Sequence, residues 1–191
     1  MKIYYHLSKN GFTNSYLVVN DDPNVMQALI VDPAAVTSEL ISQIEDGGYT
    51  LTGVLVTHNH EHHIKGLETI KRIYKPKVYA ADYEVCGNWS TVLGGEGTIS
   101  EAGLTITYFS LPGHTSDSMV FRIENVFFTG DVLFAGTIGS TGSKYAERML
   151  CNNIHTKILS QNDNCVVLPG HGPPSTVGAE RMYNIDLAAQ K

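Results

Sequence analysis

The side chains of this chain that are best suited to chemistry are histidines, and four of its eight histidines lie within six consecutive positions. They are found in the stretch THNHEHHIKG, and GHTSDS, TGDVLF and PGHG later in the chain each add one candidate, two histidines and an aspartate in all. The candidates are His58, His60, His62, His63, His114, Asp131 and His171. Imidazole nitrogens and carboxylate oxygens bind divalent transition metals, so this set of residues predicts a metal site.

Each part of this set directly follows an apolar run. VLVT precedes His58, and similar runs ending in glycine precede His114, Asp131 and His171. Because strand ends meet at one edge of a sheet, these distant positions can share a small volume. Burying so many imidazoles without a cation would be unfavourable, because they lose solvation and repel one another when protonated. The alternative, that these are solvated loop histidines, does not explain why each follows a buried strand. His6 and His155 lack this placement, and we interpret them as non-ligands.

The apolar periodicity predicts the elements that must position these residues. Strands are expected at about 2–7, 14–20, 28–32, 53–57, 77–80, 104–111, 118–123, 125–130 and 165–169. Helices are expected at about 36–46, from 64 to a stop before Pro76, at 144–159 and at 179–189, and the glycine-rich LGGEG is expected to form a loop. Two blocks of strands followed by helices, without a polar linker, predict a four-layer αββα sandwich of two similar halves. We expect residues 1–191 to form a single domain.

Composition excludes some classes of function. The formal net charge is −6, which gives no reason to expect nucleic-acid binding. The chain has no apolar run long enough to cross a bilayer, and its first residues lack the apolar core of a signal peptide. Three cysteines form no even framework. We therefore expect a cytoplasmic protein that acts on a small molecule, without nucleic-acid or membrane partners, and its oligomeric state is not predicted.

The order and spacing of THNHEHHIKG, GHTSDS, GDVLF and PGHG resemble the metal motifs of the metallo-β-lactamase fold superfamily. The resemblance extends from TNSYLV to PGHGPPSTVGAER, and GDVLFAGTIG with PGHGP is most similar to small glyoxalase II-like (hydroxyacylglutathione hydrolase-like) proteins. It implies the same four-layer α/β fold. It also implies that His58, His60 and His114 bind one divalent metal and that position 62, His63 and His171 bind a second. Asp131 would then bridge the two metals.

One residue departs from this pattern, because the family motif H-x-H-x-D-H has aspartate where this chain has His62. An imidazole is a good zinc or iron ligand, so we expect His62 to bind the second metal. The alternatives are a weakly filled second site or substitution by Glu61. Losing one carboxylate leaves the centre more positive and favours an anionic substrate. We assign His62 and Asp131 as catalytic residues, because position 62 would orient the attacking water and Asp131 would bridge the metals.

The resemblance implies a hydrolase that uses a metal-activated hydroxide on a thioester or similar small ester. Two divalent ions are expected, zinc first, with iron or manganese as alternatives. Only twenty residues follow His171, too few for the helical domain of full-length glyoxalase II, and Ser140 stands where relatives often carry a basic residue. Candidate pocket walls are the loop with Trp89 and the segment from Phe134 to Tyr145, although exposed aromatics or a capping Ser143 would explain these residues equally well.

Two other functions stay open. Persulfide dioxygenases share this fold and bind a single iron through residues matching His58, His114 and Asp131, so an oxidoreductase is one alternative. A non-catalytic metal-binding module is the other, because the replacement at His62 could mark a decayed site. The presence of His63 and His171 favours two metals and hydrolysis.

Overall fold

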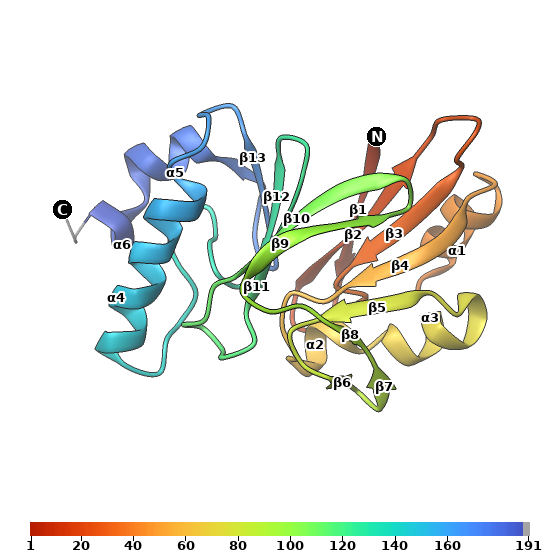
Figure 1. The fold of residues 1–191 in the computed structure, drawn as a ribbon, viewed down its shortest axis with the longest axis horizontal. Helices are drawn as coiled ribbons and strands as arrows, with labels where there is room; N and C mark the ends of the chain where they lie inside the picture. Colours follow the sequence, from red (N-terminus) through yellow and green to blue (C-terminus); the bar gives the residue numbers. More distant parts are fainter. Residues whose placement is uncertain (189–191) are drawn as a thin grey trace.

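Two six-stranded β-sheets face each other in this protein, whose residues 1–188 are described by a computed structural model (Figure 1). The first sheet has the order β1 (Lys2–Ser8), β2 (Thr13–Asn20), β3 (Gln27–Val31), β4 (Thr50–Leu55), β5 (Lys77–Ala80) and β8 (Thr91–Val92). The second has the order β14 (Ser175–Thr176), β13 (Val166–Pro169), β12 (Val126–Gly130), β11 (Met119–Ile123), β10 (Leu104–Ser110) and β9 (Glu96–Glu101). A small hairpin, β6 (Glu84–Val85) and β7 (Asn88–Trp89), lies apart from both.

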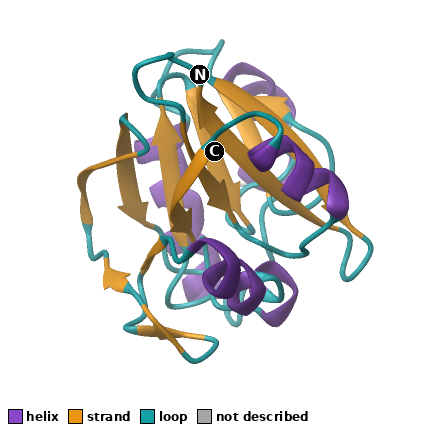
Figure 2. Ribbon diagram, turned by 90° about the vertical axis from the view of Figure 1, so that its right-hand side faces the viewer, coloured by secondary structure: helices purple, strands orange, loops and turns teal. Residues whose placement is uncertain are grey.

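Helices cover the outer face of each sheet. The first sheet is covered by α1 (Ser38–Glu45) and α3 (Leu67–Tyr74), and the short α2 (Glu61–Ile64) lies between the two halves (Figure 1). The second is covered by α4 (Lys144–Asn153), a π-helical turn (Ile154–Ile158), α5 (Val177–Tyr183) and α6 (Ile185–Ala188). Figure 2 shows the strands side by side with the helices outside them. The predicted αββα sandwich is therefore confirmed.

No helix within residues 1–188 is both long and apolar enough to cross a bilayer.

The alternation of side chains along the strands builds the layers. On β2, Tyr16 and Val18 point into the core between the sheets, whereas Leu17 and Val19 pack under α1 and α3. On β12, Phe128 lies in the core between the sheets and Phe127 lies under α4. Successive side chains of a strand point to opposite faces, so strands buried on both faces must be apolar throughout.

Hydrogen bonds join the two halves at the ends of their strands. The backbone N–H of Met119 donates to the carbonyl oxygen of Thr57 at 2.7 Å, and that of Asn14 donates to the carbonyl oxygen of Gly170 at 2.8 Å. The hydroxyl of Tyr16 donates to the carbonyl oxygen of Pro169 at 2.7 Å. Thr57 and Gly170 directly precede His58 and His171, so these bonds fix the candidate metal ligands of one half against those of the other.

Three expectations about secondary structure were wrong. The helix expected from residue 64 is split into α2 and α3 at Gly66, whose N–H donates to the carbonyl oxygen of Pro33 at 2.7 Å instead of continuing the helix. The helix expected over 179–189 begins earlier and breaks at Asn184, whose backbone is extended; residue 189 lies outside the described residues. The sequence analysis also missed β9, because glycines at its start were interpreted as a loop.

The core between the sheets predicts a large stability effect. Phe121 is fully buried there, and Phe121→Ala is expected to lower the free energy of unfolding by about 3–5 kcal/mol, since it leaves a cavity between two sheets. Urea unfolding in the presence of a metal chelator measures this without a contribution from bound ions. The control is Leu7→Ala, at a half-exposed position on the edge strand β1, with an expected change of less than about 1 kcal/mol. An equal loss for the two variants would contradict this view of the core.

Candidate metal centre

All seven predicted site residues come together where the ends of the two sheets meet. His58 follows β4 and His114 follows β10, while Asp131 directly follows β12 and His171 follows β13 after one intervening glycine. The helix α2 begins after His60 and carries the other two histidines. The ligand atoms form two groups, each with all atoms within 4.8 Å of one another: His58, His60, His114 and Asp131, and His62, His63, Asp131 and His171.

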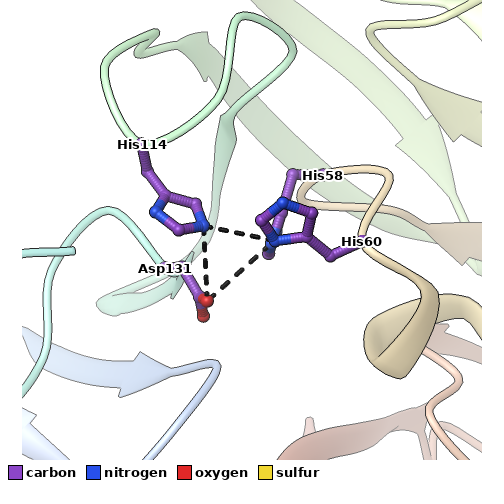
Figure 3. A group of neighbouring side chains, drawn as sticks. All are labelled: His58, His60, His114 and Asp131. Carbon is purple, nitrogen blue, oxygen red and sulfur yellow. Dashed lines mark hydrogen bonds and ion pairs between the residues drawn. The ribbon is translucent and has the colours of Figure 1, made fainter. Parts of the chain in front are cut away.

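The first group has the separations of a tetrahedral site (Figure 3). Nδ1 of His60 lies 2.9 Å from Nε2 of His58 and 3.3 Å from Nε2 of His114. Oδ2 of Asp131 lies 3.8 Å from Nε2 of His58 and 3.6 Å from Nε2 of His114. Ligands held about 2.0–2.2 Å from a tetrahedral zinc ion are about 3.3–3.5 Å from one another. The four side chains therefore already fit a divalent cation.

The second group has similar spacing. Nε2 of His171 lies 3.3 Å from Nε2 of His62 and 3.5 Å from Oδ2 of Asp131. Nε2 of His63 lies 3.3 Å from Oδ1 of Asp131. His62 thus lies where the sequence analysis expected it, facing the same space as the other members of this group. Asp131 belongs to both groups, with Oδ1 nearest His63 and Oδ2 nearest His58, His114 and His171.

Two buried atoms at the centre lack hydrogen bonds. Nε2 of His63 and Oδ1 of Asp131 are both buried, and at 3.3 Å they are within ion-pair distance but without hydrogen-bond geometry. Buried polar atoms are nearly always satisfied, and an unpaired one costs about 1–3 kcal/mol. A cation between these atoms would satisfy both. The donor set and these unpaired atoms together fit a divalent metal site.

Hydrogen bonds from Nδ1 fix how three of the imidazoles are presented. Nδ1 of His114 donates to the carbonyl oxygen of Ser140 at 2.8 Å, and Nδ1 of His171 donates to that of Phe12 at 3.1 Å. Nδ1 of His63 lies 2.8 Å from Oδ2 of Asp32. Because Nδ1 carries a proton in each of these contacts, Nε2 is the nitrogen left to bind a cation.

Asp32 is a functional residue that the sequence analysis missed. It is buried, and its carboxylate accepts from the backbone N–H of Thr57 at 2.7 Å and from the Thr57 hydroxyl at 2.6 Å. That hydroxyl in turn lies 3.1 Å from Nδ1 of His58. Asp32 therefore orients His63 directly and His58 through Thr57, one residue of each group. It follows β3 as the other site residues follow their strands, a signal that was available in ALIVD.

The protonation states suit metal binding. Burial and the neighbouring His63 lower the pKa of His58 to about 3, and burial also lowers the pKa of His60 and His62. Burial alone would raise the pKa of Asp131, but the adjacent imidazoles of His171 and His63 lower it well below its usual range. Burial is likewise outweighed at His63, where the carboxylates of Asp32 and Asp131 raise the pKa. A cation entering this centre would meet neutral imidazoles at His58, His60 and His62 and a carboxylate at Asp131, and it would displace a proton from His63.

Two glycines leave the room that the centre needs. A Cβ at Gly170 would lie 2.4 Å from Oδ1 of Asp131, and a Cβ at Gly130 would lie 2.4 Å from Oγ1 of Thr57. Gly130 also has a φ of +48°, a conformation that favours glycine. These two close approaches explain why glycine directly precedes Asp131 and His171.

Other residues singled out in the sequence lie outside both groups. Glu61 is exposed and belongs to neither group, and His6 instead pairs with Gln43 at 2.9 Å. Ser143 caps α4, accepting from Ala146 N at 3.1 Å, which supports the structural interpretation of this serine. Trp89 is exposed and contacts Tyr83, with ring centroids 4.7 Å apart. In the segment from Phe134 to Tyr145, the ring centroid of Phe134 lies 6.1 Å from that of His171.

Known proteins resemble the chain along most of its length. The family model of the metallo-β-lactamase superfamily matches residues 9–176. A hydroxyacylglutathione hydrolase, GloC, of Haemophilus influenzae is 29% identical over 195 residues, covering 90% of this chain and 91% of that protein. A probable metallo-hydrolase, YqgX, of Bacillus subtilis is 30% identical over 198 residues, covering 90% of each.

A solved structure agrees with these sequence matches. The B3 metallo-β-lactamase BLEG-1 superimposes with a TM-score of 0.82 at 28% identity, covering 97% of this chain and 99% of that one. The region matched by the family model, residues 9–176, includes every residue of the two donor groups, from His58 to His171. By its family match, its sandwich of two sheets and the convergence of its histidines, the chain belongs to the metallo-β-lactamase superfamily.

Proposed function

We propose that this protein is a metal-dependent hydrolase of thioesters or similar small esters, working with two divalent cations, zinc first among them. The observation that carries the proposal is the pair of adjoining donor groups that share Asp131. Each group offers three imidazole nitrogens and one carboxylate oxygen. Two cations bridged by one group are the arrangement that hydrolytic enzymes use to hold an attacking water beside a substrate carbonyl.

The relatives support hydrolysis as the reaction class. Those described above are named as a hydroxyacylglutathione hydrolase and as a probable metallo-hydrolase. Bound cations would supply the central chemistry, by lowering the pKa of water to about 7 and stabilising negative charge on the substrate oxygen. The thioester part of the proposal rests on the first of these relatives.

The chain's own residues bind and orient. Buried His58, His63 and Asp131 form the floor of the centre. His60, His62, His114 and His171 are partly exposed and form its walls. This difference in burial leaves one side open to a substrate. The Nδ1 contacts to Ser140, Phe12 and Asp32 hold the imidazoles in place before a ligand arrives, so little reorganisation is needed.

His62 bears on the charge of the substrate. With an imidazole at this position, Asp131 is the only carboxylate in either group of described ligands. The charged centre is then one unit more positive than it would be with a carboxylate there. We therefore propose a substrate that carries a carboxylate or another anionic group near its ester.

Thioester hydrolysis by zinc-loaded protein tests the function directly. We expect two zinc ions per chain by elemental analysis and turnover of a hydroxyacyl thioester. Asp131→Asn should lower kcat/KM by more than about 100-fold. Removing a residue that only hydrogen-bonds to a metal ligand already lowers metal affinity or activity about 10- to 100-fold, and Asp131 would be a ligand itself. The matched control is Asp21→Asn, a half-exposed carboxylate beyond the far end of β2, which should leave turnover unchanged.

Two results would overturn this proposal. Oxygen uptake with glutathione persulfide by iron-loaded protein, without thioester turnover, would replace the hydrolase with an oxidoreductase. Metal binding without either reaction would leave a non-catalytic metal-binding module.

His62 supplies a second prediction. His62→Asp should tighten binding of the second zinc ion about fivefold or more, because a carboxylate about 4 Å from a unit charge contributes about 1 kcal/mol even at the dielectric constant of water. Calorimetric titration of metal-free protein measures the two affinities separately. The control is His6→Asp, the same substitution at a histidine outside both groups. An unchanged second affinity in His62→Asp would show that residue 62 does not bind the second ion.

A further inference from the structure

The loop after Asp131 is held in place by the C-terminal helices. The backbone N–H of Gly136 donates to Oε2 of Glu180 at 2.9 Å, and that of Ile138 donates to Oδ2 of Asp186 at 2.9 Å. The side chain of Asn184 donates to the carbonyl oxygen of Thr137 at 3.1 Å. Three neighbouring loop residues are thus tied to α5, to α6 and to the residue between these helices.

The same loop contacts two residues of the first donor group. The carbonyl oxygen of Ser140 accepts from Nδ1 of His114 at 2.8 Å. Gly139 packs against the backbone of Asp131 so closely that a Cβ there would lie 1.7 Å from the Asp131 carbonyl oxygen. A displacement of this loop would therefore change how His114 presents Nε2. The first group has a hydrogen bond to the loop at His114, whereas in the second group the loop meets His171 only through the ring of Phe134, with centroids 6.1 Å apart, and Asp131 is common to both groups.

Glu180 is unusual for a residue on an outer helix. Its carboxylate is buried, with 3% of the residue exposed, and its donors are the backbone N–H of Gly136, the amide of Asn184 at 2.7 Å and the hydroxyl of Ser175. All three donors are neutral, so no cation offsets the desolvation of the charge. Burying a carboxylate is costly, and an apolar side chain would pack the helix against the sheet at lower cost. What the carboxylate adds is a fixed acceptor for the loop.

We propose that Glu180 and Asp186 are positioning residues for the first cation. They hold the loop of residues 134–140, and the Ser140 carbonyl in that loop holds the Nδ1–H tautomer and the orientation of His114. The inference rests on the proposed function only in that a divalent cation occupies the first group. It gives the C-terminal helices a role at the site although neither contributes a ligand to it.

Cobalt titration of Glu180→Gln tests the proposal with a readout that does not depend on catalysis. The amide keeps the size of the side chain but replaces one acceptor oxygen with a donor. We expect affinity for the first Co²⁺ to fall about 10- to 100-fold and its visible absorption bands to shift, with a clearly smaller loss of the second affinity. Asp186→Asn, at the other anchor, should have the same selective effect and keeps the test decisive if Glu180→Gln does not fold.

A matched control lies on the same helix. Arg181 of α5 forms an ion pair with Asp163 at an exposed position away from the loop, so Asp163→Asn weakens the attachment of α5 without touching residues 134–140. It should leave both Co²⁺ affinities and the absorption bands unchanged. A shift in Asp163→Asn equal to that in Glu180→Gln would show general loosening of the helix and would overturn the proposal. So would an equal loss of both affinities in Glu180→Gln, or no change in either.

Nitrogen NMR of the imidazoles gives a second readout in metal-free protein. Wild type should show His114 as a single tautomer with the proton on Nδ1, and Glu180→Gln should show a mixture of the two tautomers. An unchanged tautomer in the variant would overturn the proposal even if the protein hydrolyses no thioester. The positioning role and the proposed reaction therefore fail by different observations.

Discussion

The crowding of imidazole lone pairs around one buried carboxylate is the constraint on which this structure depends. Seven side chains present their ligand atoms to the same small volume, and at its floor Nε2 of His63 and Oδ1 of Asp131 are buried without hydrogen bonds. Without a cation, this arrangement combines a desolvation cost with electrostatic repulsion whenever the imidazoles become protonated. With divalent cations, the same atoms gain strong ligand bonds. The fold thus gathers a donor set that fits a divalent metal site.

Holding such a centre together requires that two separate sheets keep a fixed relation. The halves meet through backbone hydrogen bonds at Thr57 and Gly170, the residues that directly precede His58 and His171. Behind them Asp32 joins the two donor groups, orienting His63 directly and His58 through Thr57. The outer helices continue this support through the loop that contacts His114. Ligands, their hydrogen-bond partners and the layers behind them therefore form one connected network.

The sequence predicted the site better than its supports. Strand ends followed by histidine or aspartate located His58, His114, Asp131 and His171, because β-strands carry a strong apolar signal and the edge where they end is shared. The histidine-rich stretch after His58 supplied the other three converging residues. Asp32 escaped because it was counted as the last residue of its strand, and its role depends on contacts across 25 to 31 residues of chain. The break at Gly66 depends on the carbonyl of Pro33, and the break at Asn184 accompanies contacts to Thr137 and Glu180. Such tertiary contacts leave no local periodicity to detect. That residues 1–191 form one domain stays a prediction.

Anomalous diffraction at the zinc absorption edge, from crystals of protein purified with zinc, would locate cations in the two donor groups. We expect two strong peaks separated by about 3.5 to 4 Å, one within bonding distance of His58, His60 and His114 and the other of His62, His63 and His171, with Asp131 between them. Absence of any peak at this position in zinc-saturated crystals, with the seven side chains turned away from one another, would contradict this expectation.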